Sequence, residues 1–308
     1  VALALLLVLP RGSGLTLEKL LALVVLALLG TGFVASERLQ SWAEVAAYQE
    51  PVVYAESSRF QRIVLTRSND DLRLYLNGNL QFSSRDEYRY HEALVHPALA
   101  RVASPRNILI LGGGDGLAAR EVLRYPGVES IVLVDLDPEV TRLFSTSPVL
   151  RALNRDALKS SRVKIFNVDA LQWLEKSADL FDFIVVDFPD PSNYSLGKLY
   201  TSVFYRLLAR HLAPEGLAVI QSTSPLYARQ SFWCVVTTLE NAGLVATPYH
   251  ALVPSFGAWG FIIAGRRPFT PPTAYELEHR FLTPEVTRAM FLFPKDMDRV
   301  PAEVNRLN

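Results

Sequence analysis

The sequence predicts an α/β fold, in which a doubly wound, Rossmann-like parallel sheet follows a small N-terminal antiparallel β-region. After Pro105, continuous runs of Ile, Val and Leu alternate with helical stretches, a pattern typical of parallel strands that are buried on both faces. Two later runs have no helix between them, which predicts an antiparallel hairpin at the sheet edge. The strands are expected at 108–111, 131–134, 163–168, 183–186 and 217–221, the helices at 117–125, 138–144, 170–176, 200–211 and 226–241, and the hairpin at 245–253 and 259–264.

Shorter patterns assign the segments on either side of this sheet. Apolar and polar residues alternate over 59–66 and 72–76, Asn77-Gly78 is a strong hairpin signal, and 86–103 has a helical pattern. A doubly wound sheet closed by a hairpin resembles the architecture of class I S-adenosylmethionine-dependent transferases. We therefore predict a β-region at 49–84, a Rossmann-like domain at 85–268, and a C-terminal helix and tail at 269–308.

Residues 1–38 are predicted to be a membrane segment. The run at 15–35 has 21 residues with only two charges, Glu18 and Lys19, and as a helix it would be about 31 Å long, enough for a bilayer core of about 30 Å. We predict a transmembrane helix here, with 1–9 as the end of an earlier span; a buried helix of a soluble protein and a signal peptide are the alternatives. The protein is then expected at the cell membrane, and its single cysteine favours a reducing, cytoplasmic location for the following domain.

Charge and composition exclude several classes of protein. The 308 residues include 31 Lys and Arg against 31 Asp and Glu, so the chain has no net positive charge with which to bind nucleic acid. The one cysteine, Cys234, excludes an internal disulfide and a cysteine-rich zinc site, and the five histidines lack metal-ligand spacing. We predict no nucleic-acid partner and no metal, and we expect Cys234 to be buried in a helix.

Aspartates follow four of the predicted strands at their carboxyl ends, where a doubly wound sheet binds its ligands. They are Asp115 in the glycine loop 112–116, Asp135 with Asp137, Asp169, and Asp187 with Asp190. Taken singly, each of Asp137, Asp169 and Asp190 is explained as well by a role as turn former or helix N-cap as by a role in ligand binding. Taken together in a chain without net charge, the aspartates predict a pocket that holds cations.

The glycine loop is open to two interpretations. Residues 114–119 fit the G-x-G-x-x-A pattern of dinucleotide-binding proteins, and Asp135 is spaced to hold a ribose, so an NAD-dependent dehydrogenase is one candidate. However, Asp115 would repel a diphosphate at the helix N-terminus. S-adenosylmethionine or its decarboxylated form, which has a positive charge and no phosphate, avoids this conflict. Asp135 is then placed to bind the ribose hydroxyls, Asp169 the adenine amino group, and Asp187 the reacting end.

An ordered series of motifs resembles the spermidine synthases, the polyamine aminopropyltransferases, over roughly residues 54–300. The motifs lie at 60–63, 76–81, 85–92, 111–116, 134–137, 168–170, 187–191, 204–205, 221–222, 254–261 and 284–291. The chain is most similar to the bacterial branch in which a membrane region precedes the synthase domain. The resemblance implies transfer of an aminopropyl group from decarboxylated S-adenosylmethionine to a diamine such as putrescine, giving spermidine and 5′-methylthioadenosine. It also implies a homodimer without a permanently bound cofactor or metal.

The resemblance implies roles for individual residues as well. Asp187 is expected to be the catalytic base and, with Asp115, to hold the amine of the aminopropyl group. The cofactor side is expected to comprise Gln61, Gly112, Gly114, Asp135, Asp169 and Ala170, and the acceptor side Gln81, Tyr90, His91, Asp190 and Gln221. His91 is also explained as a packing residue of its helix. Trp173, Trp233 and the pair at 204–205 are expected in the core.

Three residues depart from the family pattern. Phe60 and Phe256 stand where tyrosine is usual, and Asp135 stands where glutamate is common. These changes keep the nucleoside side intact and leave the acceptor amine open. Two other functions also remain open: a methyltransferase of the same fold that uses S-adenosylmethionine itself, and a non-catalytic domain that senses polyamines or nucleosides for a membrane protein.

Overall fold

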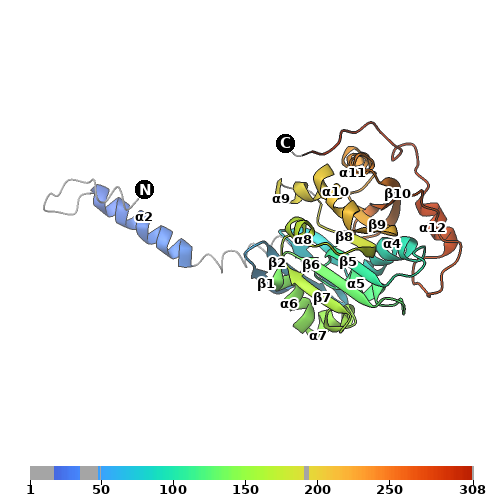
Figure 1. Ribbon diagram of the computed structural model, residues 1–308. Helices are drawn as coiled ribbons and strands as arrows, with labels where there is room; N and C mark the ends of the chain where they lie inside the picture. The colour runs from blue at the N-terminus through green and yellow to red at the C-terminus, as the bar shows by residue number, and fades with distance from the viewer. Residues whose placement is uncertain (1–16, 35–47, 49, 191–193, 307–308) are drawn as a thin grey trace.

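The computed structural model describes residues 17–34, 48, 50–190 and 194–306, which include a small sheet and a larger one (Figure 1). The small sheet is antiparallel, with its strands in chain order: β1 (Val52–Ser57), β2 (Arg62–Ser68), β3 (Asp71–Leu76) and β4 (Asn79–Ser83). Asn77 and Gly78 join β3 to β4, and both have positive φ angles, +50° and +80°. These angles are typical of a two-residue hairpin turn. The hairpin predicted from these two residues is therefore confirmed.

The larger sheet has seven strands in the order β10-β11-β9-β8-β5-β6-β7. Five of them are parallel, and β10 and β11 form an antiparallel hairpin at one edge. The bounds are β5 (Asn107–Gly112), β6 (Ser130–Asp135), β7 (Val163–Asn167), β8 (Phe181–Asp187), β9 (Leu212–Ser222), β10 (Val245–Val253) and β11 (Gly257–Gly265). This is the predicted doubly wound sheet closed by a hairpin.

Helices cover both faces of the larger sheet, because alternate strand side chains point to opposite faces. In β5, Ile108 and Ile110 belong to one hydrophobic core, and Leu109 and Leu111 belong to the other. The first core is covered by α4 (Glu87–Leu99), α5 (Leu117–Val122), α6 (Pro138–Thr146), α7 (Pro148–Leu153) and α12 (Pro284–Met290), and the second by α8 (Ala170–Lys176), α10 (Ser202–His211) and α11 (Arg229–Asn241). Figure 1 shows α10 and α11 on the side of the sheet opposite α6 and α7.

Several details differ from the sequence prediction. The helix α7, the 3₁₀ helix η1 (Ala157–Lys159), the short helix α9 (Tyr194–Gly197) and the 3₁₀ helix η2 (Lys198–Tyr200) were not expected as separate elements. Trp233 is buried as predicted, whereas Trp173 is only partly buried against the second core. Cys234 is in a helix, α11, but it is half-buried rather than buried, because the helix directs its neighbours Phe232, Trp233, Val235 and Val236 into the core.

The apolar run near the N-terminus forms the helix α2 (Leu17–Val34). Among the residues that the structure describes, no helix combines the length and the apolar character needed to cross a membrane. This finding corrects the prediction of a transmembrane helix over 15–35. With 18 residues, α2 is about 27 Å long, shorter than a hydrocarbon core of about 30 Å, and Glu18 and Lys19 fall in its first turn. The earlier span predicted at 1–9 lies outside the described residues.

Candidate active site

The carboxyl ends of β5 and β8 form the switch point of the larger sheet. The chain continues from β5 to its neighbour β6 on one side, whereas β8 pairs with β5 on the other side. Doubly wound proteins bind their ligands at such a point. Gly112 at the end of β5 lies directly opposite Asp187 at the end of β8. The strand order itself therefore brings two of the predicted site residues together.

Glycines allow the loop after β5 to approach two of the aspartates. Gly112 has a φ of +82°, and a Cβ at this position would lie 2.2 Å from the carbonyl oxygen of Asp187. A Cβ on Gly114 would lie 2.7 Å from Oδ2 of Asp135. A methyl group cannot approach an oxygen this closely, so only glycine fits at either position.

Asp135, at the end of β6, is bonded to the backbone of two loops. Its Oδ2 accepts from the N–H of Gly114 at 3.0 Å, and its Oδ1 accepts from the N–H of Asp137 at 2.8 Å. Burial raises the pKa of this carboxyl to about 6, although the two backbone N–H groups act in the opposite direction. Each carboxylate oxygen has a further lone pair, so Asp135 can still accept hydrogen bonds from two hydroxyl groups.

Gln61, which directly precedes β2, is linked to the larger sheet through Asp137. Gln61 Nε2 donates to Asp137 Oδ2 at 2.9 Å, and Ser58 Oγ donates to the same oxygen at 2.7 Å. Oδ1 of Asp137 caps α6 by accepting from the N–H of Glu139 at 3.0 Å. The N-cap interpretation of Asp137 is therefore confirmed. The small sheet brings Gln61 next to the end of β6, where Asp135 lies.

Asp169, which directly precedes Ala170, caps α8 and forms an ion pair. Its Oδ1 accepts from the N–H of Leu171 and of Gln172, as the N-cap interpretation predicted. Its Oδ2 accepts from Lys198 Nζ at 2.5 Å. Burial raises the pKa of Asp169, but the bonds from Lys198 and from the capping N–H groups outweigh burial and bring the pKa below its usual value. An adenine amino group at this position would share Asp169 with the lysine ammonium.

Asp187 and Asp115 lie at the switch point. Tyr90 Oη donates to Asp187 Oδ1 at 2.6 Å, and Asp115 Oδ1 accepts from the N–H of Leu117 at 2.9 Å. Burial raises the pKa of Asp187 to about 6 and also raises the pKa of Asp115, and the positive charge of His91 is the strongest opposing influence on both. Within the described parts of the chain, neither carboxylate pairs with Lys or Arg. Both are therefore available to a cationic ligand.

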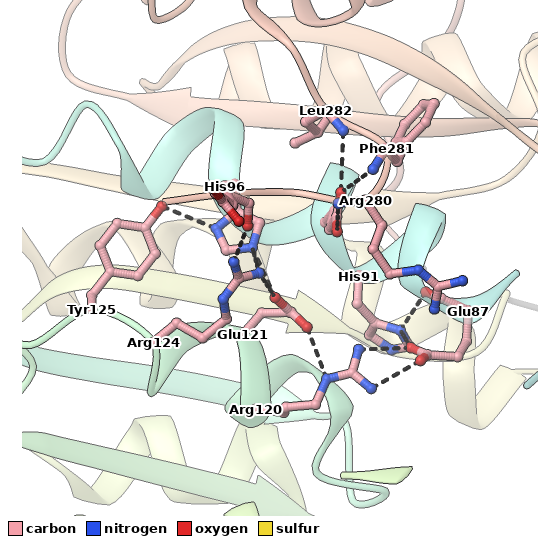
Figure 2. A network of polar contacts seen from close by, with 12 residues as sticks. Glu87, His91, His96, Arg120, Glu121, Arg124, Tyr125, Arg280, Phe281 and Leu282 are labelled. Atoms are coloured by element: carbon pink, nitrogen blue, oxygen red, sulfur yellow. Dashed lines mark hydrogen bonds and ion pairs between the residues drawn. The ribbon is translucent and has the colours of Figure 1, made fainter. Parts of the chain in front are cut away.

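His91 is buried in α4 and is held by Glu87 (Figure 2). Its Nδ1 lies 2.8 Å from the carbonyl oxygen and 2.9 Å from Oε2 of Glu87. Burial lowers the pKa of His91, but the bond to Glu87 and the nearby carboxylates outweigh burial and raise it overall. The burial of His91 agrees with the packing interpretation, and its charge also interacts with those of Asp115 and Asp187.

Gln221, at the end of β9, holds several polar and aromatic side chains together. Its Nε2 donates to Asp190 Oδ1 at 3.4 Å and to Tyr200 Oη at 3.2 Å. Its Oε1 accepts from Trp259 Nε1 at 3.0 Å. Burial raises the pKa of Asp190. The family resemblance gave Gln221 and Asp190 a role in the site. It gave none to Tyr200 or to Trp259, because aromatic residues in strands and helices usually belong to the core.

The hairpin turn between β10 and β11 brings Phe256 against Tyr90. The Ser255 N–H and Oγ donate to the Asp86 carboxylate at 2.6 and 2.9 Å, which fixes this turn at the start of α4. The ring centres of Phe256 and Tyr90 are 6.1 Å apart, and those of Phe256 and Trp259 are 5.0 Å apart. Tyr90, Phe256 and Trp259 thus give the candidate site an aromatic side.

Gln81 is the predicted residue that the contacts do not connect to this cluster. On β4, its Nε2 donates to the carbonyl oxygens of Asn79 and Leu80 at 3.0 and 3.3 Å, so its amide bonds to its own strand.

In the described ranges, no group of three or more His, Cys, Asp or Glu side chains is arranged to hold a metal ion. The site is therefore a set of carboxylates with a hydroxyl, an imidazole and aromatic rings, which suits a cationic organic ligand.

Comparisons with known proteins identify the relatives of this chain. A family model described as the spermine/spermidine synthase domain matches residues 87–270. The chain is 58% identical over 284 residues to polyamine aminopropyltransferase 2 of Ralstonia nicotianae, covering 92% of this chain and 56% of the relative. It is 47% identical over 302 residues to the polyamine aminopropyltransferase of Leptospira interrogans, covering 98% of this chain and 61% of the relative. The chain spans little more than half the length of these curated relatives.

Solved structures agree with the family model. Spermidine synthase in complex with the transition state analogue AdoDATO is similar with a TM-score of 0.74 and 25% identity, covering 80% of this chain and 88% of that one. Spermidine synthase from Thermotoga maritima is similar with a TM-score of 0.73 and the same identity, covering 80% of this chain and 87% of that one. Sequence relatives, fold and family model thus agree, and the chain belongs to the spermine/spermidine synthase family.

Proposed function

We propose that this chain transfers an aminopropyl group from decarboxylated S-adenosylmethionine to a diamine such as putrescine, giving spermidine and 5′-methylthioadenosine. The observation that carries the proposal is the pair of carboxylates, Asp115 and Asp187, which lie at the switch point and have no Lys or Arg partner among the residues that the structure describes. Decarboxylated S-adenosylmethionine carries a sulfonium and an ammonium but no carboxylate, so it complements this charge. The names of the relatives, polyamine aminopropyltransferase, support the same activity.

The nucleoside is assigned to the ends of β6 and β7. Asp135 accepts hydrogen bonds from the two ribose hydroxyls. Gln61 is held beside the ribose by its hydrogen bond to Asp137. Asp169 and Ala170, at the start of α8, take the adenine ring. Gly112 and Gly114 let the loop lie close enough for the sulfonium side of the cofactor to reach Asp187.

The acceptor amine is assigned to the opposite side of Asp187. Tyr90 orients the Asp187 carboxylate through its hydroxyl, and His91 lies beside it. Asp190, held by Gln221, is placed to bind the distal ammonium of the diamine. Gln81 is assigned to this side by its place in the family motif alone.

The reaction requires little more than positioning and one proton acceptor. The amine nitrogen attacks the aminopropyl carbon, the C–N bond forms, and the C–S bond breaks with its electron pair on sulfur, so a neutral thioether leaves and no general acid is needed. The new secondary ammonium gives its proton to Asp187. A lysine-like ammonium has a pKa of about 10.4, and the pKa of about 6 for Asp187 makes this carboxylate a better acceptor than an ordinary aspartate. Alignment of nitrogen, carbon and sulfur supplies the remaining acceleration.

A product assay tests the proposed function. Purified protein is incubated with decarboxylated S-adenosylmethionine and each of a panel of diamines and triamines, and 5′-methylthioadenosine and the extended amine are quantified. We expect one molecule of each product per turnover, with at least one diamine in the panel as acceptor. Absence of both products with every amine would overturn the proposal.

Discrimination between the two forms of the cofactor separates this activity from that of a methyltransferase. Asp115 and Asp187 repel the carboxylate of S-adenosylmethionine, so we expect calorimetry to show decarboxylated S-adenosylmethionine binding at least about tenfold more tightly. The Asp115→Asn variant should narrow this difference, because it removes one of the two repelling charges. Tighter binding of intact S-adenosylmethionine, or transfer of its methyl group to an amine, would favour the methyltransferase instead.

The pH dependence of kcat/KM is expected to follow the ionisation of Asp187. Because burial raises the pKa of Asp187 to about 6, its carboxylate becomes protonated below that pH and can neither hold a cation nor accept a proton. We expect kcat/KM to fall about tenfold per pH unit below pH 6. The hydrogen bond from Tyr90 lowers the pKa of Asp187, so in Tyr90→Phe the fall should begin at a higher pH. A profile that is flat from pH 7 to pH 5 would contradict this assignment.

A further inference from the structure

A chain of buried charged side chains leads away from the candidate active site (Figure 2). It starts at His91, whose Nδ1 lies 2.9 Å from Glu87 Oε2. Arg120 on α5 bonds to both oxygens of Glu87, Nη1 to Oε1 at 2.8 Å and Nη2 to Oε2 at 2.9 Å. Arg120 Nε donates to Glu121 Oε1 at 2.8 Å, and Glu121 also binds His96. The side chains of Glu87 and Arg120 are only 4% and 7% exposed, so the pair is shielded from water.

These contacts determine which ring nitrogen of His91 carries a proton. Nδ1 faces the carbonyl oxygen and a carboxylate oxygen of Glu87, and both are acceptors, so Nδ1 must be the donor. In the described parts of the chain, Nε2 has no protein partner, and it is not among the fully buried unpartnered atoms. Nε2 is therefore the nitrogen that is open to a ligand.

The groups around His91 are mostly anionic. Glu87 and Tyr90 belong to its own helix, Arg120 to α5, Asp115 to the glycine loop, and Asp187 to the end of β8. The Asp115 and Asp187 carboxylates favour a positive charge on His91, and His91 in turn favours their ionised forms. Burial raises the pKa of Glu87, but its bonds to His91 and Arg120 lower the pKa to about 2 overall. Glu87 thus remains a carboxylate at neutral pH, although it is buried.

We propose that Glu87 and Arg120 are positioning residues for the reaction: they hold His91 with its proton on Nδ1 and its Nε2 toward the acceptor amine, which binds beside Asp187. Arg120 keeps Glu87 ionised and in place, and Glu87 orients the imidazole. When a cationic substrate replaces the charge that protonated His91 supplies, the ring releases the proton from Nε2 to solvent water, and the lone pair left on Nε2 accepts from the substrate ammonium. The identity of the amine rests on the proposed function, whereas the orientation of His91 does not.

Two glutamates of the same network give a matched pair of variants. Glu87 and Glu121 both bind Arg120, and their side chains are similarly buried, 4% and 6% exposed, but only Glu87 touches His91. We expect Glu87→Gln to lower kcat/KM for the amine by at least about tenfold, since it removes a charged hydrogen-bond partner, and to change the pH profile. Glu121→Gln should destabilise the fold to a similar extent and leave kcat/KM within about threefold. Equal losses in the two variants would mean a structural role only and would overturn the proposal.

Nuclear magnetic resonance of ¹⁵N-histidine-labelled full chain tests the orientation of His91 without turnover. The His91→Gln spectrum identifies the signals of His91 among those of the five histidines. We expect protonated Nδ1 throughout the titration in the ligand-free protein, a lower pKa for His91 in Glu87→Gln, and an unchanged one in Glu121→Gln. A neutral ring protonated on Nε2 in the unmodified chain would refute the proposal even if Glu87→Gln did not fold. Because this arm needs no product, its outcome stands even if the proposed function fails.

Discussion

Replacement of Asp187 by asparagine is expected to lower kcat by about 10²- to 10⁴-fold, the usual contribution of a proton acceptor, and to leave the affinity for 5′-methylthioadenosine within a few-fold. Asparagine keeps the size of the side chain and can still accept the hydrogen bond from Tyr90, but it cannot take a proton. Single-turnover product formation and calorimetry with 5′-methylthioadenosine measure the two effects separately.

The same variant is expected to raise the melting temperature of the ligand-free protein at pH 7.5. The pKa of Asp187 in the folded chain is about 6, above its ordinary value of 3.8, so the folded state binds more protons than the unfolded state between these values. Stability then falls as the pH rises through this window, and the ionised carboxylate is a net cost above pH 6. An amide avoids that cost. This gain in stability with a loss of activity is expected of a residue that is kept for its chemistry.

Asp182 provides the control, because it lies on the same strand, β8, at the end away from the site. Its Oδ2 accepts from the backbone N–H of Arg106 and Asn107, each at 2.9 Å. Asp182→Asn should therefore keep kcat within about twofold, since hydrogen bonds of this exposed kind contribute about 1 kcal/mol to stability and none to chemistry. If Asp187→Asn retained kcat within tenfold of the unmodified chain, Asp187 would not be the proton acceptor. A non-catalytic sensor would show no turnover before or after either change.

The second large effect is expected on stability, from Arg120→Met. Arg120 is the shared partner of two buried carboxylates, Glu87 and Glu121, and its removal takes one ion-pair partner from each of them. Breaking a buried ion pair in this way costs about 3–5 kcal/mol. Denaturation with urea, monitored by tryptophan fluorescence, should show a free energy of unfolding lower by that amount.

Arg299→Met is the matched control for this experiment. Arg299 binds Glu240 at distances of 2.9 and 2.5 Å, comparable to those around Arg120, but its side chain and that of Glu240 are 52% and 36% exposed. Exposed pairs contribute at most about 1 kcal/mol, so the loss should be small. If the two variants lost the same free energy, burial would not be the reason for the importance of Arg120.

Short-range patterns predicted most of the elements of the fold. The helix α8 begins at Ala170 as expected, because Asp169 is an N-cap whose signal lies within three residues. The strand β10 has the predicted bounds because a strand's apolar character is visible along its own length. The helix α7 escaped prediction because only Leu150 of its six residues is buried, which leaves no periodic pattern. The dehydrogenase suggested by the glycine loop is not supported, since the chain belongs to the spermine/spermidine synthase family.

One apolar pattern led to a prediction that the structure does not support. The run at 15–35 predicted a transmembrane helix, yet among the described residues no helix is long and apolar enough to cross a membrane. The domain boundaries and the homodimer, which rest on sequence patterns and resemblance, stay predictions.

The location of the candidate site could be predicted from the chain, because aspartates lie at the ends of β5, β6, β7 and β8 and the carboxyl ends of parallel strands lie at the same edge of a sheet. The contacts that hold each side chain could not be predicted and are seen in the folded structure alone. Gln61 meets Asp137 from 76 residues away, Arg120 meets Glu87 from 33 residues away, and Trp259 meets Gln221 from 38 residues away. No local pattern encodes such pairs, because burial forces polar groups to find partners wherever the packing of distant elements brings them. The residues to which we assign the chemistry were thus visible in the chain, whereas the contacts through which we propose that Glu87 and Arg120 position His91 appeared only in the fold.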